Sequence, residues 1–166
     1  MKKKSIVSLP QCLLKSLLNY DENLVEEQGG FILKSPDKED YEFIPVTSDM
    51  HSKPGAVGLY VANTEEFGNK ILAKTIDGFK IHASFHTHPV GMRALPSSTD
   101  LSELFTSFPI NYIYAPFREL NRFTYNDGEW EMHNVLVFDG FDPYKHSRKP
   151  KVKIDALDSW IESENL

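Results

Sequence analysis

The sequence has only one cysteine, Cys12, among its 166 residues. A single cysteine excludes an intrachain disulfide and any structural zinc site built from several thiolates, and it favours a reducing compartment. It also argues against a zinc deaminase, because the Pro-Cys-x-x-Cys element of those enzymes needs two cysteines.

Long apolar runs are also missing. No segment approaches the stretch of about 18 apolar residues that a membrane span needs. The basic start at residues 1–4 resembles the beginning of a signal peptide, but Pro10, Gln11 and Lys15 interrupt the apolar stretch that should follow. We therefore expect a cytoplasmic protein without a membrane partner.

The chain lacks an excess of positive charge. It has 18 Lys and Arg against 24 Asp and Glu, a net charge of −6, and no basic stripe that would bind phosphate backbones. Nucleic acid is therefore not an expected partner. The one basic run, residues 145–153, is interpreted as a solvated linker, with contact to an acidic partner as the alternative.

Length and composition predict one domain over residues 1–166. Apolar residues make up 40% of the chain, enough to bury a core, which we place at about residues 7–140. Residues 141–166 are expected to form a basic linker and a short closing helix carrying Leu157, Trp160 and Ile161. There are no internal repeats, and the oligomeric state is not predicted.

Two histidines stand at the end of a segment that alternates like a β-strand. Residues 79–85 alternate apolar and polar side chains, and His86-Thr87-His88-Pro89 follows. Cα atoms two residues apart in a strand lie roughly 6 to 7 Å apart, so both imidazoles can bind one ion. We expect the alternate apolar side chains to point into the core: Phe79, Ile81, Ala83 and Phe85.

A hydroxyl and a carboxylate come next in the chain. Ser97 and Asp100 precede apolar residues at helical spacing, so Asp100 is predicted in the first helical turn, on the same side as Ser97. With His86 and His88, Asp100 would complete three ligands. A fourth tetrahedral position would then be open to water, as catalytic zinc sites require.

Together these residues resemble the JAMM motif, His-x-His-Pro followed by Ser-x-x-Asp, of the JAB/MPN+ zinc isopeptidases, the Mov34/MPN/PAD-1 group. That family also has an upstream glutamate in a Glu-x-x-Gly-hydrophobic context, which Glu27 and Gly30 resemble. The resemblance runs from about residue 7 to residue 125. It implies an MPN (JAB) fold, with an architecture like that of cytidine deaminases.

The resemblance implies a Zn²⁺ ion held by His86, His88 and Asp100, with Glu27 as the general base and Ser97 stabilising the oxyanion. The implied activity is hydrolysis of a peptide or isopeptide bond at the C-terminus of a ubiquitin-like or other modifier protein. Antiphage defence and sulfur-carrier processing are candidate settings. The alternative is a non-catalytic MPN scaffold, although scaffolds typically lose ligands that this chain keeps.

The chain departs from the family pattern at two points. Residues 90–96 make seven positions between Pro89 and Ser97 where the family usually has six, which bears on loop shape and substrate fit. Gly29 stands where many members have Cys or Met.

Each candidate also has a plainer interpretation. Glu26 competes with Glu27 for the upstream position, and both could be exposed acids. Ser97 could be only a helix cap, and Asp100 only a favourable residue at a helix N-terminus. Another strand histidine, His82, is placed on the face of His86 as a structural or supporting group. The remaining histidines lack a partner at ligand spacing: His51, His133 and His146.

The hydrophobic pattern predicts an α/β protein with a mixed sheet flanked by helices. Helices are predicted near residues 10–20 and 63–75, and strands near 30–35 and 41–47. Further strands are predicted at 111–114, 122–125 and 130–138, with residues 126–128 as the turn of a hairpin.

Overall fold

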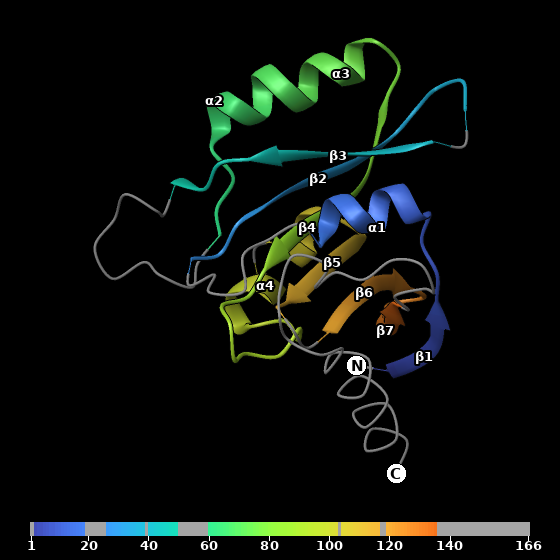
Figure 1. Ribbon diagram of the computed structural model, residues 1–166, viewed down its shortest axis with the longest axis vertical. Coiled ribbons are helices and arrows are strands. Elements are labelled where there is room, and N and C mark those ends of the chain that lie inside the picture. Colours follow the sequence, from blue (N-terminus) through green and yellow to red (C-terminus); the bar gives the residue numbers. More distant parts are fainter. Residues whose placement is uncertain are drawn as a thin grey trace.

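A computed structural model of the chain describes residues 2–18, 26–38, 40–49, 60–102, 104–116 and 119–135 (Figure 1). Its centre is a seven-stranded mixed sheet in the order β1-β7-β6-β5-β4-β2-β3. The strands are β1 (Lys2–Val7), β2 (Gly29–Lys34), β3 (Tyr41–Val46), β4 (Lys80–Thr87), β5 (Ile110–Ala115), β6 (Glu119–Asn126) and β7 (Glu129–Val135).

Two of the strand pairs are parallel, β4 with β5 and β1 with β7, and the other pairs are antiparallel. Strand β4 therefore lies between β5 and β2, in the interior of the sheet. Its last five residues are buried. The side chains at the C-terminal end of β4 are therefore shielded from solvent by what packs on the two faces of the sheet.

Helices cover both faces of this sheet (Figure 1). On one face α1 (Gln11–Leu17) packs Leu13, Leu14 and Leu17 against a core that includes Phe85 and Tyr112. On the other face lie α2 (Thr64–Phe67), the π-helical turn η2 (Gly68–Leu72) and α3 (Ala73–Ile76), followed by α4 (Ser98–Ser102) and α5 (Leu104–Ser107). The predicted α/β class with a mixed, helix-flanked sheet is confirmed.

The predicted elements within the described residues are present, including the helix near 63–75, which continues through η2. The hairpin turn has Asp127 and Gly128 at positive φ (52° and 80°), as a two-residue turn requires. Strand β1 was not predicted. The expected linker and closing helix at 141–166, with His51 and His146, lie outside the described residues.

The register of β4 differs from simple alternation. Ile32 pairs with Ala83 but Leu33 pairs with Ile81, so His82 is an extra residue, a β-bulge. Ala83 and Phe85 consequently face α1, whereas Phe79 and Ile81 pack against the core on the opposite face.

The bulge corrects the expectation for His82. Its ring contacts Tyr41, at a centroid distance of 4.8 Å, and Tyr41 packs against the core under α1. His86 points to the opposite face, so a supporting role for His82 beside His86 is wrong. None of the helices in the described ranges combines the length and the apolar character of a membrane span.

Candidate metal centre

The antiparallel pairing of β2 with β4 brings Glu27 to the two histidines. Gly29 pairs with His86, and one step further the Thr87 amide donates to the Gln28 carbonyl at 2.7 Å. The Gln28 amide in turn donates to the Thr87 hydroxyl at 3.0 Å. Because strand partners advance in opposite directions, the next residue, Glu27, arrives level with His88.

Gly29 is required at this crossing by close packing. A Cβ atom built on it would overlap the Phe85 carbonyl oxygen and lie 3.0 Å from both the Cβ of His86 and the ring of Tyr60. The space that a Cys or Met side chain would need is therefore filled here.

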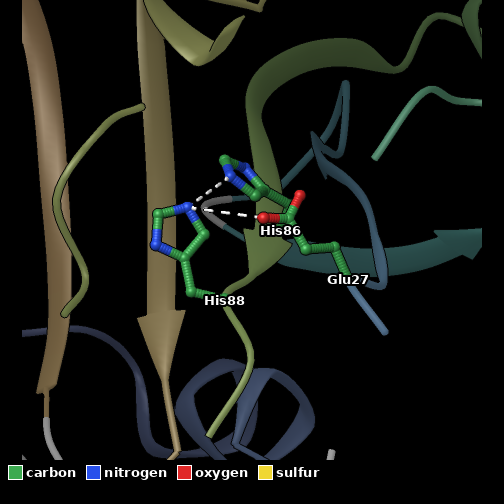
Figure 2. Close-up of side chains that lie close together, drawn as sticks. All are labelled: Glu27, His86 and His88. Carbon is green, nitrogen blue, oxygen red and sulfur yellow. Dashed lines mark hydrogen bonds and ion pairs between the residues drawn. The ribbon is translucent and has the colours of Figure 1, made fainter. Parts of the chain in front are cut away.

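His86 and His88 direct the same ring nitrogen to one point (Figure 2). Their Nε2 atoms lie 3.3 Å apart, and both residues are buried, at 0% and 1% exposure. Two nitrogens bound to one tetrahedral ion at 2.0 to 2.1 Å would be about 3.3 to 3.4 Å apart. The two imidazoles thus have the spacing that a shared ion requires.

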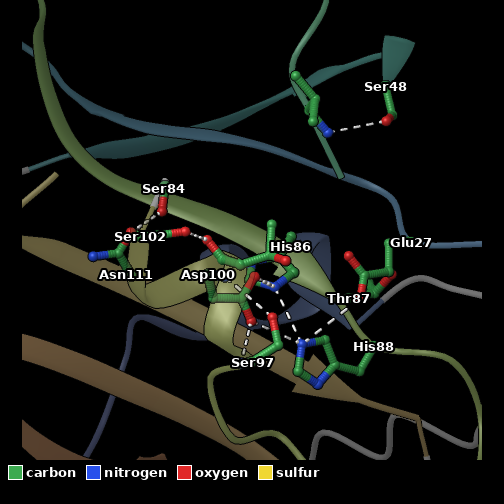
Figure 3. Close-up of polar contacts among 12 residues, drawn as sticks. Glu27, Ser48, Ser84, His86, Thr87, His88, Ser97, Asp100, Ser102 and Asn111 are labelled. Atoms are coloured by element: carbon green, nitrogen blue, oxygen red, sulfur yellow. Dashed lines mark hydrogen bonds and ion pairs between the residues drawn. The ribbon is translucent and has the colours of Figure 1, made fainter. Parts of the chain in front are cut away.

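The first turn of α4 supplies the carboxylate (Figure 3). The Ser97 amide donates to Oδ2 of Asp100 at 2.8 Å, and the Asp100 amide donates to the Ser97 hydroxyl at 3.1 Å. These two reciprocal hydrogen bonds form a helix cap, so Ser97 does cap α4, as one of its two interpretations from the sequence predicted. The same cap fixes the Asp100 side chain toward the histidines.

Asp100 contacts both imidazoles. Its Oδ1 lies 3.1 Å from His86 Nε2, and its Oδ2 lies 3.2 Å from His88 Nε2. Burial alone would raise the pKa of Asp100, but the hydrogen bonds with His86 and His88 outweigh it and hold the pKa below its usual range. A carboxylate kept ionised beside two imidazoles is a suitable metal ligand.

The other ring nitrogen of His88 is held by the backbone. Nδ1 lies 2.7 Å from the Arg93 carbonyl oxygen, so Nδ1 carries a proton. Burial opposes protonation of the ring, but the hydrogen bonds with Asp100 and the Arg93 carbonyl outweigh it and raise the pKa of His88, so Nε2 offers a lone pair to an ion only after it has lost its own proton. Burial lowers the pKa of His86, which favours the neutral ring that a metal binds. Within the described residues, Nδ1 of His86 has no hydrogen-bond partner.

Glu27 completes the cluster, and its position allows two roles. Its Oε1 is 3.8 Å from His88 Nε2, and Glu27, His86 and His88 form a buried group that could hold a metal ion. Burial raises the pKa of Glu27 to about 8, with Asp100 adding to the rise and His88 and the Tyr60 amide opposing it. Glu27 can thus be either a fourth ligand or a base beside the ion.

All five predicted site residues come together in this centre. His86, His88, Asp100 and Glu27 are buried, while Ser97 is exposed at its rim. Glu27 rather than Glu26 belongs to the group that could hold a metal ion. His133 lies outside the centre, and its Nε2 forms a hydrogen bond with the Thr124 hydroxyl at 3.1 Å.

Two further contributors to the centre could not be predicted from residue patterns. Tyr60 stacks its ring nearly parallel to His86, at 6.3 Å between centroids, and donates its hydroxyl to the Val46 carbonyl. Its backbone amide bonds Glu27. The Arg93 carbonyl holds His88 through a backbone atom, which no residue pattern can reveal.

The ligand atoms of the cluster restrict which metal ions can bind but do not identify one. Imidazole nitrogens and carboxylate oxygens suit zinc and several other divalent transition ions. The buried cluster can therefore hold a metal ion, and its ligand atoms suit more than one kind of ion.

Two solved structures are similar to this chain, and the first of them supports the fold. The solution structure of a protein from Desulfitobacterium hafniense is similar with a TM-score of 0.55 and 16% identity, covering 90% of this chain and 99% of that one. A protein from Salinibacter ruber gives a TM-score of 0.47 and 17% identity, over 84% and 93% of the two chains. No family model and no curated protein matches the sequence. At 16% identity the likeness to the first of these proteins concerns the fold alone. The activity has to be inferred from the residues of the site.

Proposed function

We propose that the chain is a zinc-dependent metallopeptidase of the JAMM/MPN+ type. The proposed reaction is hydrolysis of a peptide or isopeptide bond at the C-terminus of a ubiquitin-like or other modifier protein. The proposal joins the motif resemblance to the geometry of the cluster. The observation that carries it is the 3.3 Å spacing of His86 Nε2 and His88 Nε2, with the Asp100 carboxylate within 3.2 Å of each.

In this proposal His86, His88 and Asp100 hold the ion. A bound zinc ion supplies Lewis acidity, which polarises a carbonyl group and acidifies water. Glu27 takes a proton from the attacking water on its carboxylate and returns it to the departing amine nitrogen. A base does this best when its pKa lies near the working pH, and burial has moved Glu27 in that direction.

Ser97 is placed to stabilise negative charge on the substrate. Its oxygen accepts a hydrogen bond from the Asp100 amide, which leaves its own O–H as a donor. Because Ser97 is exposed at the rim, that donor can reach a bound carbonyl group. The helix cap and the catalytic role are therefore compatible in one side chain.

The test combines metal analysis with peptide hydrolysis. Purified protein should contain about one zinc per chain and cleave ubiquitin-like fusions or isopeptide conjugates. A chelator should abolish cleavage and added zinc should restore it. Activity that survives both zinc removal and Glu27→Ala would refute the proposal.

A second candidate is a metal-binding scaffold without catalysis, favoured by the proximity of Glu27 to His88. If Glu27 were a fourth ligand, the ion would be closed to water, as in structural zinc sites. Stoichiometric zinc without hydrolysis in any fusion or conjugate would favour this candidate.

A further inference from the structure

We propose that Glu119, together with Asn121, is a positioning residue of the metal centre. It fixes the loop whose Arg93 carbonyl orients His88. The inference rests on the proposed metal-binding role of His88, and it assigns a function to buried polar groups on β6 that the reaction itself does not use.

The first step is the dependence of His88 on one backbone atom. His88 follows β4, and its amide donates to the Tyr114 carbonyl at 2.8 Å, which holds its backbone. The direction of its ring is fixed separately, by Nδ1 at 2.7 Å from the Arg93 carbonyl oxygen. If that carbonyl moves, Nε2 turns away from His86 and Asp100.

The second step is that the segment carrying Arg93 runs over the surface. Val90 and Met92 are 41% and 47% exposed, and Gly91 has a φ of 91°. Its own turn is closed by the Met92 amide and the Pro89 carbonyl at 3.1 Å. A surface segment of this kind can keep the His88 ring in a precise orientation only if residues elsewhere in the fold fix the position of the Arg93 carbonyl.

Glu119 supplies that anchor from the first residue of β6. Its side chain is 3% exposed, and its Oε1 accepts from Arg93 Nε and from the Ala94 amide, both at 2.9 Å. Its Oε2 lies 3.3 Å from Arg93 Nη2. A two-point, charge-assisted grip of this kind fixes orientation as well as position.

Asn121, two residues after Glu119 on β6, also binds the backbone of Ala94. Its Nδ2 donates to the Ala94 carbonyl at 3.0 Å, and its Oδ1 accepts from Asn134 on β7 at 2.8 Å. Glu119 and Asn121 share one face of β6 because side chains alternate along a strand. Both polar backbone groups of Ala94 are therefore bound by this strand, directly after the residue that holds His88.

Metal affinity is the first readout. Zinc affinity of the full chain is measured by competition with a chromogenic chelator in wild type, Glu119→Ala and Glu119→Gln. Removing groups that orient a metal-binding histidine typically costs about 10- to 100-fold in affinity. We expect about a 10-fold loss for Glu119→Ala and a smaller loss for Glu119→Gln, whose amide oxygen can still accept from Ala94.

The matched control is Thr124→Val on the same strand. It removes a side-chain hydrogen bond to His133 but leaves the 90–96 loop untouched. Thr124→Val should leave zinc affinity unchanged even where it lowers the melting temperature. A general loss of stability on β6 is thereby separated from loss of positioning.

The second readout needs no metal. Long-range ¹H–¹⁵N spectra of the histidine rings, recorded in chelator at a pH where the rings are neutral, report which nitrogen of His88 carries the proton. Wild type and Thr124→Val should show it on Nδ1, and the Glu119 variants should show a mixture.

Unchanged affinity and an unchanged ring spectrum in a folded Glu119→Ala protein would overturn the inference and leave the proposed function intact. If wild type itself takes up no zinc, the proposed function fails and the ring spectra alone decide on Glu119. If Glu119→Ala does not fold, Glu119→Gln decides by the same two readouts.

Discussion

At the scale of single residues, Glu27 shows how a fold changes the chemistry of a side chain. It lies buried between the Tyr60 amide and His88, in a place where an ionised carboxylate is poorly solvated. The same proximity to Nε2 of His88 suits a proton acceptor and a ligand equally. One substitution separates the two roles.

Glu27→Gln should retain zinc while losing catalysis. The amide keeps the size of the side chain but cannot accept a proton, so the turnover number should fall by about 10²- to 10⁴-fold. Zinc affinity, measured by chelator competition, should stay close to that of wild type. His88→Ala is the comparison, and a loss of affinity in Glu27→Gln as large as in His88→Ala would make Glu27 a ligand instead.

At the scale of elements, local rules account for most of the helices and turns. The α2 helix begins after Asn63, whose side chain accepts from the Glu66 amide at 2.8 Å. Glu66 in turn accepts from the Thr47 amide at 3.0 Å and from Lys70 at 2.6 Å. The start of α2 is thus tied to the residue that follows β3.

Glu66 gives this junction a pH dependence. The hydrogen bonds from Lys70 and Thr47 hold the pKa of Glu66 below its ordinary value, so the folded state prefers the ionised form. Its contribution should be complete above about pH 5 and should disappear as the pH falls through the lowered pKa.

Urea unfolding from pH 7 into the acid range checks this. Glu66→Gln should be less stable than wild type at pH 7, and the difference should shrink on acidification. Glu65→Gln removes one negative charge from the same turn and is the control. Because Lys70 is about half exposed, added salt should also reduce the difference. A gap between Glu66→Gln and wild type that is independent of pH would contradict the assignment.

Two glycines should respond oppositely to alanine. Gly128 has a φ of 80° in the hairpin turn, where a Cβ atom is strained, so Gly128→Ala should lower the free energy of unfolding by about 1 to 2 kcal/mol. Gly68 is helical, and an added Cβ meets nothing within 4 Å, so Gly68→Ala should raise it by up to about 1 kcal/mol. Denaturant unfolding of both variants is the measurement, and changes of equal sign would contradict the turn geometry.

The sequence predicted what is local. The strand before His86, the helix after Ser97 and the 126–128 turn follow from periodicity and turn chemistry. Strand β1 was missed because its run of lysines resembles a targeting signal and its place is set by parallel pairing with β7, far away in the chain. The bulge at His82 and the grip of Glu119 on Ala94 were missed for a similar reason, since both depend on partners from other strands.

At the scale of the whole molecule, the sheet assembles the centre from distant segments. Glu27 lies just before β2, His86 near the end of β4 with His88 directly after it, and Asp100 in α4, which follows the loop held by β6. The side chains that could hold a metal ion are therefore close together only in the folded chain. An ion that binds them all must bind the folded state in preference to the unfolded one.

Zinc should accordingly stabilise the entire domain. At a free concentration about 100 times the dissociation constant, linkage predicts about 2.7 kcal/mol, which for a chain of this size raises the melting temperature by about 5 to 10 °C. Thermal unfolding of chelator-treated protein with and without zinc measures this shift. Asp100→Asn should reduce it strongly, whereas Glu27→Gln should retain it if Glu27 acts as a base. A melting temperature that zinc leaves unchanged would mean that the four side chains are near one another without forming a metal site.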